Sequence, residues 1–385
     1  MRVAVVVKSL KIGGMERAAI NLADTFANEG HDCHLIYFKA KDRALFPNKF
    51  VKVHLFELEK LLKLTIIGWL LNIFAKLLNG IFRHSYFLWQ GFLLSPIFIY
   101  KLNQIEKKYG KFDLIVIRGQ GTFEMIWSYN DTNLVIQQVN ILRKYKTPLN
   151  DFFRRTVFSK KQIMCNSPSI FKELKVDFKK SDVNYKSLFV IPSPINSELV
   201  KQKSLEYKPD FSDKYIINIG RLAPVKNISL LIDAFAYARN NLGLEHKLVI
   251  VGSGNIETNL ERQVNKLEMN DYIHFTGELT NPYPWLKKAD LFVFTSLNEG
   301  LPNVLLESLA CETNIVSTRG RGGTLDIMSG DLTKNLTSFD KKEIAKKIME
   351  LLSSTHKIDY YKHLEIYKPK AIAEQYVNAY LQFIK

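Results

Sequence analysis

Residues 291–307 read LFVFTSLNEGLPNVLLE, and this stretch decides the kind of fold that the chain adopts. The run Leu291–Thr295 is apolar and rich in aromatic residues, which is typical of a strand buried on both faces of a sheet. A loop follows to Pro302, and then the apolar spacing of a helix that carries Glu307. A buried strand that leads through a loop into a helix is the repeating unit of a parallel sheet covered by helices.

The same alternation of strand and helix patterns runs along the whole chain. The first series of predicted strands is Val3–Val7, His34–Phe38, Lys52–Leu55, Leu114–Ile117, Leu134–Gln137, Ile163–Asn166 and Leu188–Ile191. The second is Tyr215–Ile219, Lys247–Val251, Ile273–Thr276, Leu291–Thr295 and Asn314–Ser317. Two such series predict an α/β protein with two doubly wound domains.

The connection between the two series is stiff. Ile191-Pro-Ser-Pro-Ile195 holds two prolines, which favour an extended backbone. We therefore expect domains at 1–195 and 196–370. The polar stretch 198–214 predicts a loop after the joint.

The composition excludes several classes of protein. Hydrophobic residues make up 46% and charged residues 24% of 385, so the chain is neither disordered nor fibrous. Cys33, Cys165 and Cys311 lie far apart, which fits neither a disulfide framework nor a zinc site. The apolar run at Val3–Val7 is too short for a signal peptide. These features predict a cytoplasmic location.

The positive charge is concentrated in the first domain. Residues 1–195 hold 30 Lys and Arg against 15 Asp and Glu, whereas the remainder holds 24 against 23. A basic half suggests a polyanionic partner, which would be a nucleic acid, an anionic membrane surface or a phosphorylated substrate. The alternative is a lysine-rich surface that serves only solubility.

The composition of segment 61–100 indicates which of these kinds of partner is favoured. At helical spacing, Thr65, Gly68, Asn72, Lys76, Asn79 and Arg83 form one narrow polar stripe, and Leu, Ile, Phe and Trp69 cover the rest. The longest stretch without a charged residue, 84–100, includes His84, Gln90 and Pro96 and is a poor candidate for a spanning helix. We expect an amphipathic helix that lies in an anionic membrane interface, with a helix of the protein core as the alternative.

Charged residues follow three predicted strands of the second domain. Arg221 and Lys226 lie in the turn after Tyr215–Ile219, where doubly wound folds bind ligands, and they would bind phosphate oxygens. Glycines also follow the next strand, at Gly252-Ser-Gly254. After Leu291–Thr295, Glu299 can face a ligand at the start of a helix, and the neighbouring N–H groups at Gly300, Leu301 and Asn303 can bind phosphate. Glu307 lies on that helix, within reach of a ribose diol.

The first strand also ends in a candidate binding turn. Gly13 and Gly14 would let a ligand approach the backbone, and the helix that follows offers free N–H groups to an anion. Glu16 is either an acceptor-side residue or an acid that complements the helix dipole.

These motifs together resemble a GT-B glycosyltransferase and are similar to glycosyltransferase family 4, also called group 1. The resemblance rests on Gly13-Gly14-Met-Glu16-Arg17, Ile191-Pro-Ser-Pro-Ile195, Gly220-Arg221-Leu with Lys226-Asn227, Val251-Gly252-Ser-Gly254 and the segment from Glu299 to Glu307. The match is dense over residues 215–330 and sparser over 1–195.

The resemblance implies two Rossmann-like domains that face each other across a cleft, with the last helix, about 371–385, packing back on the first domain. The first domain would bind the acceptor and the second a nucleotide-diphosphate sugar, with UDP favoured over GDP. Arg221 and Lys226 would neutralise the diphosphate, Glu299 would contact the donor sugar, and Glu307 would bind the ribose hydroxyls. Gly13 and Gly14 would let the first loop close over the diphosphate or the acceptor. The expected activity is a hexosyl or N-acetylhexosaminyl transfer that retains anomeric configuration.

Metal-dependent transfer is not expected. The chain has no Asp-x-Asp pair, so a GT-A type metal site lacks its usual ligands, and two cations can stabilise a departing diphosphate instead. The chain departs from the family in lacking a His after the strand at 114–117. No general base is therefore assigned, and Arg118 and Gln120 are acceptor-side candidates.

The favoured prediction is a peripheral membrane enzyme that acts on a lipid-anchored glycan in lipopolysaccharide, capsule or lipid-linked oligosaccharide synthesis. A first alternative is a related enzyme with a soluble acceptor. A second is a basic nucleic-acid-binding protein, which no zinc-finger or RNA-recognition motif supports. A third is a non-catalytic binder of nucleotide sugars, although all four charged site residues are present.

Overall fold

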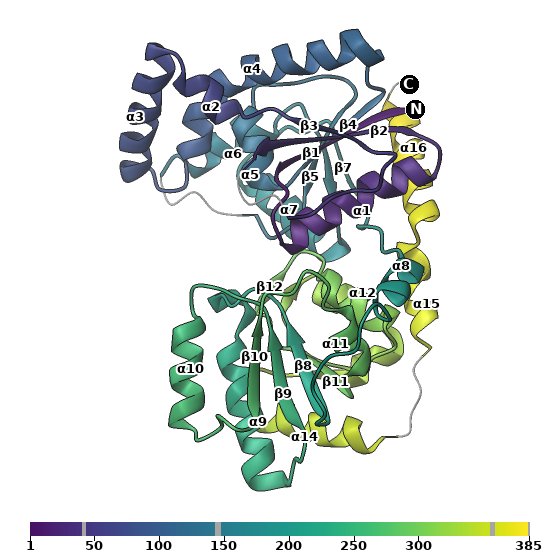
Figure 1. Ribbon diagram of the computed structural model, residues 1–385. Helices are drawn as coiled ribbons and strands as arrows, with labels where there is room; N and C mark the ends of the chain where they lie inside the picture. Colours follow the sequence, from purple (N-terminus) through teal and green to yellow (C-terminus); the bar gives the residue numbers. More distant parts are fainter. Residues whose placement is uncertain (41–43, 143–147, 355–358, 384–385) are drawn as a thin grey trace. The chain divides into compact units, whose positions relative to one another are not determined.

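The computed structural model describes residues 1–40, 44–142, 148–354 and 359–383. The chain divides into two compact units (Figure 1). Unit 1 comprises Met1–Pro194 and Pro369–Lys385, and unit 2 comprises Ile195–Lys368.

Unit 1 is built on a parallel sheet of seven strands in the order β3-β2-β1-β4-β5-β6-β7. These strands are β1 (Arg2–Ser9), β2 (Asp32–Lys39), β3 (Lys52–Leu55), β4 (Leu114–Arg118), β5 (Leu134–Gln138), β6 (Gln162–Cys165) and β7 (Ser187–Val190). The helices are α1 (Gly14–Asn28), α2 (Leu58–Lys63), α3 (Ile66–Ile81), α4 (Tyr86–Tyr109), α5 (Gln120–Phe123), α6 (Asn150–Phe158), α7 (Pro168–Lys180) and α16 (Pro369–Phe383), with a short 3-10 turn η1 (Glu124–Ile126).

The side chains of β1 show how the sheet forms two cores. Val3, Val5 and Val7 pack on the face covered by α1 and α16, whereas Ala4 and Val6 pack on the opposite face with α2, α4, α6 and α7. Successive residues of a strand point to opposite faces, so an uninterrupted apolar strand is needed when both faces are covered. Ile372 and Tyr376 of α16 are fully buried in the first of these cores. The final helix is therefore an integral part of unit 1.

Unit 2 has a parallel sheet of six strands in the order β10-β9-β8-β11-β13-β15 and a small pair β12-β14. Its strands are β8 (Tyr215–Ile219), β9 (Lys247–Val251), β10 (Ile273–Gly277), β11 (Leu291–Phe294), β12 (Asn298–Glu299), β13 (Ile315–Thr318), β14 (Arg321–Gly322) and β15 (Leu336–Thr337). The α-helices are α8 (Ser197–Lys203), α9 (Ile228–Leu242), α10 (Glu257–Lys266), α11 (Tyr283–Lys288), α12 (Asn303–Ala310), α13 (Thr324–Ile327), α14 (Lys341–Ser353) and α15 (Tyr360–Leu364). The 3-10 helices are η2 (Pro224–Lys226), η3 (Gly330–Asn335) and η4 (Glu365–Tyr367).

The fold class and the predicted strands are confirmed, with strand ends that differ from the prediction by no more than two residues. One prediction about the joint was wrong. The stretch 198–214 is not all loop, because α8 begins at Ser197 and is capped by Asn196, whose side-chain oxygen accepts a hydrogen bond from the Leu199 N–H at 2.9 Å. An Asn cap of this kind stabilises even a short, polar helix.

The segment 61–100 forms parts of three helices instead of one amphipathic helix. Helix α2 ends at Lys63, and Thr65 caps the start of α3, since its hydroxyl accepts a hydrogen bond from the Gly68 N–H at 3.0 Å. Within the described residues, no helix is long and apolar enough to cross a membrane.

Candidate active site

The predicted residues of unit 2 come together where the strand order of the sheet reverses. β8 and β11 are neighbours, and the chain leaves them for helices that continue to opposite sides of the sheet. In open α/β sheets, ligands bind beyond the carboxyl ends of the strands at such a point. The loop after β8 carries Arg221 and Lys226, and the loop after β11 carries Glu299.

An ion pair joins the two loops. The Lys226 ammonium group contacts the Glu299 Oε1 atom, and both side chains are largely shielded from solvent, with exposed fractions of 21% and 13%. The Ser296 hydroxyl also donates to Glu299 Oε1 at 2.6 Å. Backbone contacts support the pair, since the Leu297 N–H donates to the Val225 carbonyl at 2.8 Å. Glu299 is therefore held in one orientation by two side chains.

Close backbone packing fixes the position of the Arg221 loop. Gly252 has a φ of 137°, and a Cβ atom on it would lie 2.0 Å from the Gly220 carbonyl oxygen. A Cβ atom on Gly254 would lie 2.1 Å from the Leu222 carbonyl oxygen. Only glycine fits at either position, which is the physical reason for glycines after β9.

Arg221 itself is exposed at the edge of a hollow of about 600 Å³ that Ala223, Pro224, Val225 and Asn255 also line. Among the described residues, its guanidinium makes no side-chain hydrogen bond or ion pair. An exposed cation beside a hollow at the carboxyl edge of the sheet is available to an anionic ligand.

The other predicted donor-site residues belong to the Glu299 loop and α12. Gly300 and Leu301 are buried, and the Gly300 carbonyl accepts a hydrogen bond from the Gly323 N–H at 2.8 Å, so this loop packs closely against the residues before α13. Asn303 begins α12, whose first N–H groups lack partners within the helix. Glu307 is only 7% exposed, and its Oε1 atom accepts a hydrogen bond from the Tyr283 hydroxyl at 3.1 Å.

The predicted residues of unit 1 also meet at a reversal of strand order, between β1 and β4. Gly13 and Gly14 open α1, and the buried Glu16 accepts a hydrogen bond from the Ser9 hydroxyl at 3.0 Å. Gln120 opens α5 and donates to the fully buried Glu124 at 2.8 Å. The Gly13 and Gln120 loops therefore lie side by side at one edge of the sheet.

Arg118 points into unit 1 and is 4% exposed. Its Nη2 atom donates to the Ser193 hydroxyl at 3.2 Å, and burial lowers the pKa of its guanidinium, an effect that Tyr376 of α16 partly offsets. In this position Arg118 ties together the end of β4, the proline-rich joint and the last helix.

Sequence reasoning gave no role to Ser296 or Tyr283, which touch the two glutamates. Ser296 lies directly after a buried strand, so its place near the site could have been inferred from the strand alone. Tyr283 is 24 positions from Glu307 in the chain, and no local pattern links the two.

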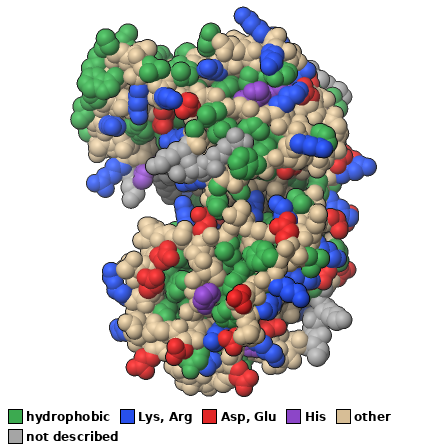
Figure 2. Space-filling view, in the orientation of Figure 1, with side chains coloured by type: hydrophobic (Ala, Val, Ile, Leu, Met, Phe, Trp, Pro, Cys, Tyr) green, Lys and Arg blue, Asp and Glu red, His purple; other side chains and the backbone are tan. Residues whose placement is uncertain are grey.

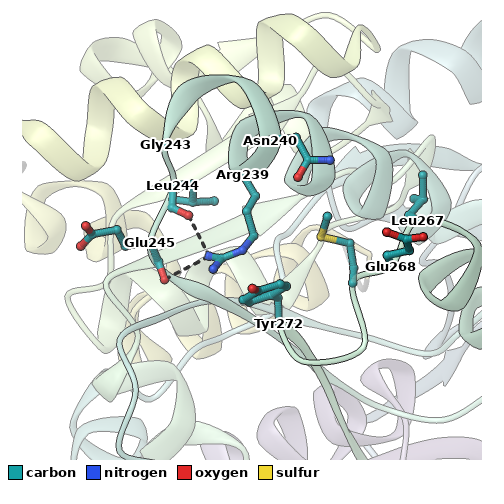
Figure 3. Close-up of a pocket in the computed structure, with 9 residues that line it drawn as sticks. Arg239, Asn240, Gly243, Leu244, Glu245, Leu267, Glu268 and Tyr272 are labelled. Carbon is teal, nitrogen blue, oxygen red and sulfur yellow. Dashed lines mark hydrogen bonds between the residues drawn. The ribbon is translucent and has the colours of Figure 1, made fainter.

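The other large hollow of unit 2, about 550 Å³, lies at the amino ends of β9 and β10, away from these residues (Figure 3). There the Arg239 guanidinium stacks 3.4 Å above the Tyr272 ring and donates to the Leu244 carbonyl at 2.9 Å. These contacts close the end of α9 and explain Arg239 as a structural residue. Within the described parts of the chain, no group of three or more His, Cys, Asp or Glu residues could hold a metal ion.

The comparison with family models decides the class of this arrangement. The model described as "Glycosyl transferases group 1" matches residues 201–371, which span the loops of Arg221, Lys226, Glu299 and Glu307. The match covers most of unit 2, and the relatives and solved structures described next extend the likeness over unit 1. The chain is a glycosyltransferase with a GT-B fold, and transfer with retention of configuration is consistent with the group.

Two relatives from Campylobacter jejuni match nearly the whole chain. One is N-acetylgalactosamine-N,N'-diacetylbacillosaminyl-diphospho-undecaprenol 4-alpha-N-acetylgalactosaminyltransferase, 27% identical over 89% of this chain and 87% of the relative. The other is an alpha-1,4-N-acetyl-D-galactosaminyltransferase whose name gives GalNAc-alpha-(1->4)-GalNAc-alpha-(1->3)-diNAcBac-PP-undecaprenol as its substrate. It is 25% identical over 91% of this chain and 89% of its own length. Among solved structures, Anabaena HepE in complex with UDP matches 98% of this chain and 99% of its own with a TM-score of 0.66 and 16% identity.

Proposed function

We propose that this group 1 glycosyltransferase moves a sugar from a UDP-sugar to a lipid-linked glycan. The observation that carries the proposal is the Lys226–Glu299 ion pair beside the exposed Arg221, at the reversal of strand order in the unit that matches the family. The two Campylobacter relatives are named for undecaprenol-linked substrates, and HepE was solved with UDP. These names support the choice of acceptor and of nucleotide.

In the proposed donor site, Arg221 and Lys226 bind the diphosphate. When the diphosphate enters, the Lys226 ammonium group turns from Glu299 toward the phosphate oxygens, and the Glu299 carboxylate, still held by Ser296, accepts hydrogen bonds from the sugar. Glu307 accepts hydrogen bonds from the ribose hydroxyls. The backbone N–H groups at Gly300, Leu301 and Asn303 add neutral donors at the start of α12.

The proposed reaction breaks the bond between the anomeric carbon and the diphosphate oxygen and forms a bond to the acceptor hydroxyl on the same face of the sugar. The hydroxyl proton passes to the departing phosphate oxygen, so no separate base is needed. The two cations stabilise the charge that develops on the diphosphate, which is the role that a divalent metal has in metal-dependent transferases. Group 1 transferases typically act without a metal, which fits this assignment.

We assign Glu16 and Gln120 to the acceptor side, because their loops share one edge of the unit 1 sheet, and we assign Gly13 and Gly14 to a loop that closes over the diphosphate or the acceptor. The buried Arg118 side chain, at the end of β4, holds this edge of the sheet against the proline-rich joint. The lipid-linked acceptor places the enzyme on the inner face of the cytoplasmic membrane, with segment 61–100 in contact with anionic lipids.

A panel of thermal-shift measurements tests the donor. We expect UDP and one UDP-sugar to raise the unfolding temperature, since a ligand at a hundred times its dissociation constant adds about 2.7 kcal/mol of stability. GDP and CMP are the matched controls. A selective response to GDP would replace UDP in the proposal, whereas no response to any nucleotide would contradict the donor site.

A transfer assay tests the acceptor. Radiolabelled sugar from the selected donor should appear in the organic phase when a polyprenyl-diphosphate-linked glycan is supplied. Transfer to the same glycan without its lipid at an equal rate would favour the soluble-acceptor alternative.

A further inference from the structure

Helix α3 buries a narrow face of small and polar residues, whereas Lys76 and most of its large apolar side chains are exposed. Gly68, Asn72 and Ala75 form its buried face. Large apolar side chains cover the remainder and are exposed, with fractions of 80% for Ile66, 69% for Ile67, 54% for Trp69, 53% for Phe74, 65% for Leu77 and 71% for Ile81. Figure 2 shows hydrophobic side chains gathered at the upper left, where Figure 1 places α3.

Hydrogen bonds to α4 hold the helix in this orientation. The Asn72 side-chain oxygen accepts from the Tyr86 hydroxyl and from the Gln90 amide, both at 2.8 Å. One turn from the end of α3, the Asn79 side-chain oxygen accepts from the Tyr86 N–H at 3.1 Å. Buried amides require such partners, so turning α3 to bury its apolar face would break three hydrogen bonds and leave the buried Gln90 amide without its partner on α3.

A close backbone contact also holds α3 in this orientation. A Cβ atom on Gly68 would lie 1.9 Å from the Leu62 carbonyl oxygen, so the start of α3 rests directly on the end of α2. The exposed face is therefore a rigid feature of unit 1. An apolar surface of this extent, exposed by the packing of its own helix, marks an interaction site.

The charge around α3 identifies the partner. Between residues 61 and 105 the chain has no Asp or Glu, while Lys63, Lys76, Arg83 and Lys101 supply four cations. A second copy of the chain on this face would bring like charges together without acidic residues to pair them. A surface that combines an apolar layer with anionic groups satisfies both the hydrophobic side chains and the cations.

We infer that α3 is a membrane-insertion helix that lies in the plane of an anionic lipid surface, with its outer face below the headgroups. Its 16 residues span about 24 Å, too short to cross the hydrocarbon layer and suited to lying along it. The inference rests on the proposed function, because it explains how the enzyme would be held beside a lipid-linked acceptor.

Vesicle sedimentation with the full chain tests the inference. The probe is a set of phosphatidylcholine vesicles with and without 30% phosphatidylglycerol, in low salt and in high salt. We expect binding to the anionic vesicles, accompanied by a blue shift of the fluorescence of Trp69 and loss of that shift in Trp69→Phe. Charged substitutions at the outer face, Trp69→Glu alone and with Ile67→Glu, should weaken binding at least tenfold.

The matched control is Leu205→Glu, which places the same charge on a 74% exposed leucine of unit 2 and should leave vesicle binding unchanged. Equal binding by the α3 variants and the wild type would overturn the inference, as would concentration-dependent dimers that Trp69→Glu converts to monomers. UDP binding, measured by thermal shift on the same samples, separates the two proposals. If the wild-type chain binds UDP normally but does not bind the anionic vesicles, the membrane helix alone is contradicted.

Discussion

At the scale of single residues, the candidate donor site depends on cations that are placed in two different ways. Lys226 is paired with Glu299, whereas Arg221 is exposed beside a hollow. The two therefore respond differently to substitution, which makes the assignment testable.

We predict that Arg221→Ala reduces sugar transfer at least a hundredfold and leaves stability unchanged to within about 0.5 kcal/mol, because an exposed side chain without ion pairs contributes little to folding. Lys226→Ala should lower both the rate of sugar transfer and the stability, since it leaves the shielded Glu299 carboxylate without its counter-ion. In Lys226→Ala with Glu299→Gln, the stability should recover while the activity stays low. Steady-state kinetics and urea unfolding measure the two effects, and full transfer activity in Arg221→Ala would contradict the site.

The sequence could predict these charged residues because each follows a strand, and strand ends are visible in the pattern of apolar runs. It could not predict Tyr283 beside Glu307 or Tyr376 beside Arg118. Those contacts depend on how helices distant in the chain pack on the sheet. Ser296 could have been predicted as a site residue, because it follows the same buried strand as Glu299.

At the scale of elements, α3 shows why a periodic pattern does not fix the orientation of a helix. The stripe Thr65, Gly68, Asn72, Lys76, Asn79 and Arg83 was visible in the sequence, and the usual expectation would place it toward solvent. Lys76 and Arg83 are exposed as expected, whereas Gly68 and Asn72 are buried. The partners that hold Asn72 inward, Tyr86 and Gln90, lie on another helix. Strands β12, β14 and β15 have two residues each, and a strand this short leaves no periodic pattern in the sequence from which to predict it.

Two glycines of α3 provide a matched test of its packing. Gly80→Ala should stabilise the protein by about 0.5–1 kcal/mol, because alanine is the better helix former and no atom lies within 4 Å of the new Cβ. Gly68→Ala should destabilise it by about 1–3 kcal/mol, since the added Cβ overlaps the Leu62 carbonyl. Thermal unfolding and limited proteolysis of α3 measure the difference. Stabilisation by both substitutions would mean that α3 does not rest on α2.

At the scale of the whole molecule, unit 1 is completed by a segment that follows unit 2 in the chain. The chain leaves this unit after Pro194 and returns at Pro369, and the returning helix places Ile372 and Tyr376 in a core with Phe26. The Tyr376 ring meets the Phe26 ring edge to face at a centroid distance of 5.3 Å. Unit 1 therefore cannot form its full core until the chain of unit 2 has been made.

This dependence predicts that a change in α16 acts on unit 1 and spares unit 2. Ile372→Ala removes a fully buried side chain from the unit 1 core and should cost about 2–4 kcal/mol of that unit's stability. Leu260→Ala, at a 2% exposed position on α10, is the matched change in unit 2. Calorimetry with and without UDP distinguishes the units, because a donor nucleotide should raise the unfolding temperature of unit 2 alone. If Ile372→Ala instead lowers the UDP-sensitive transition, the last helix stabilises the donor-binding unit, and the assignment of α16 to unit 1 is wrong.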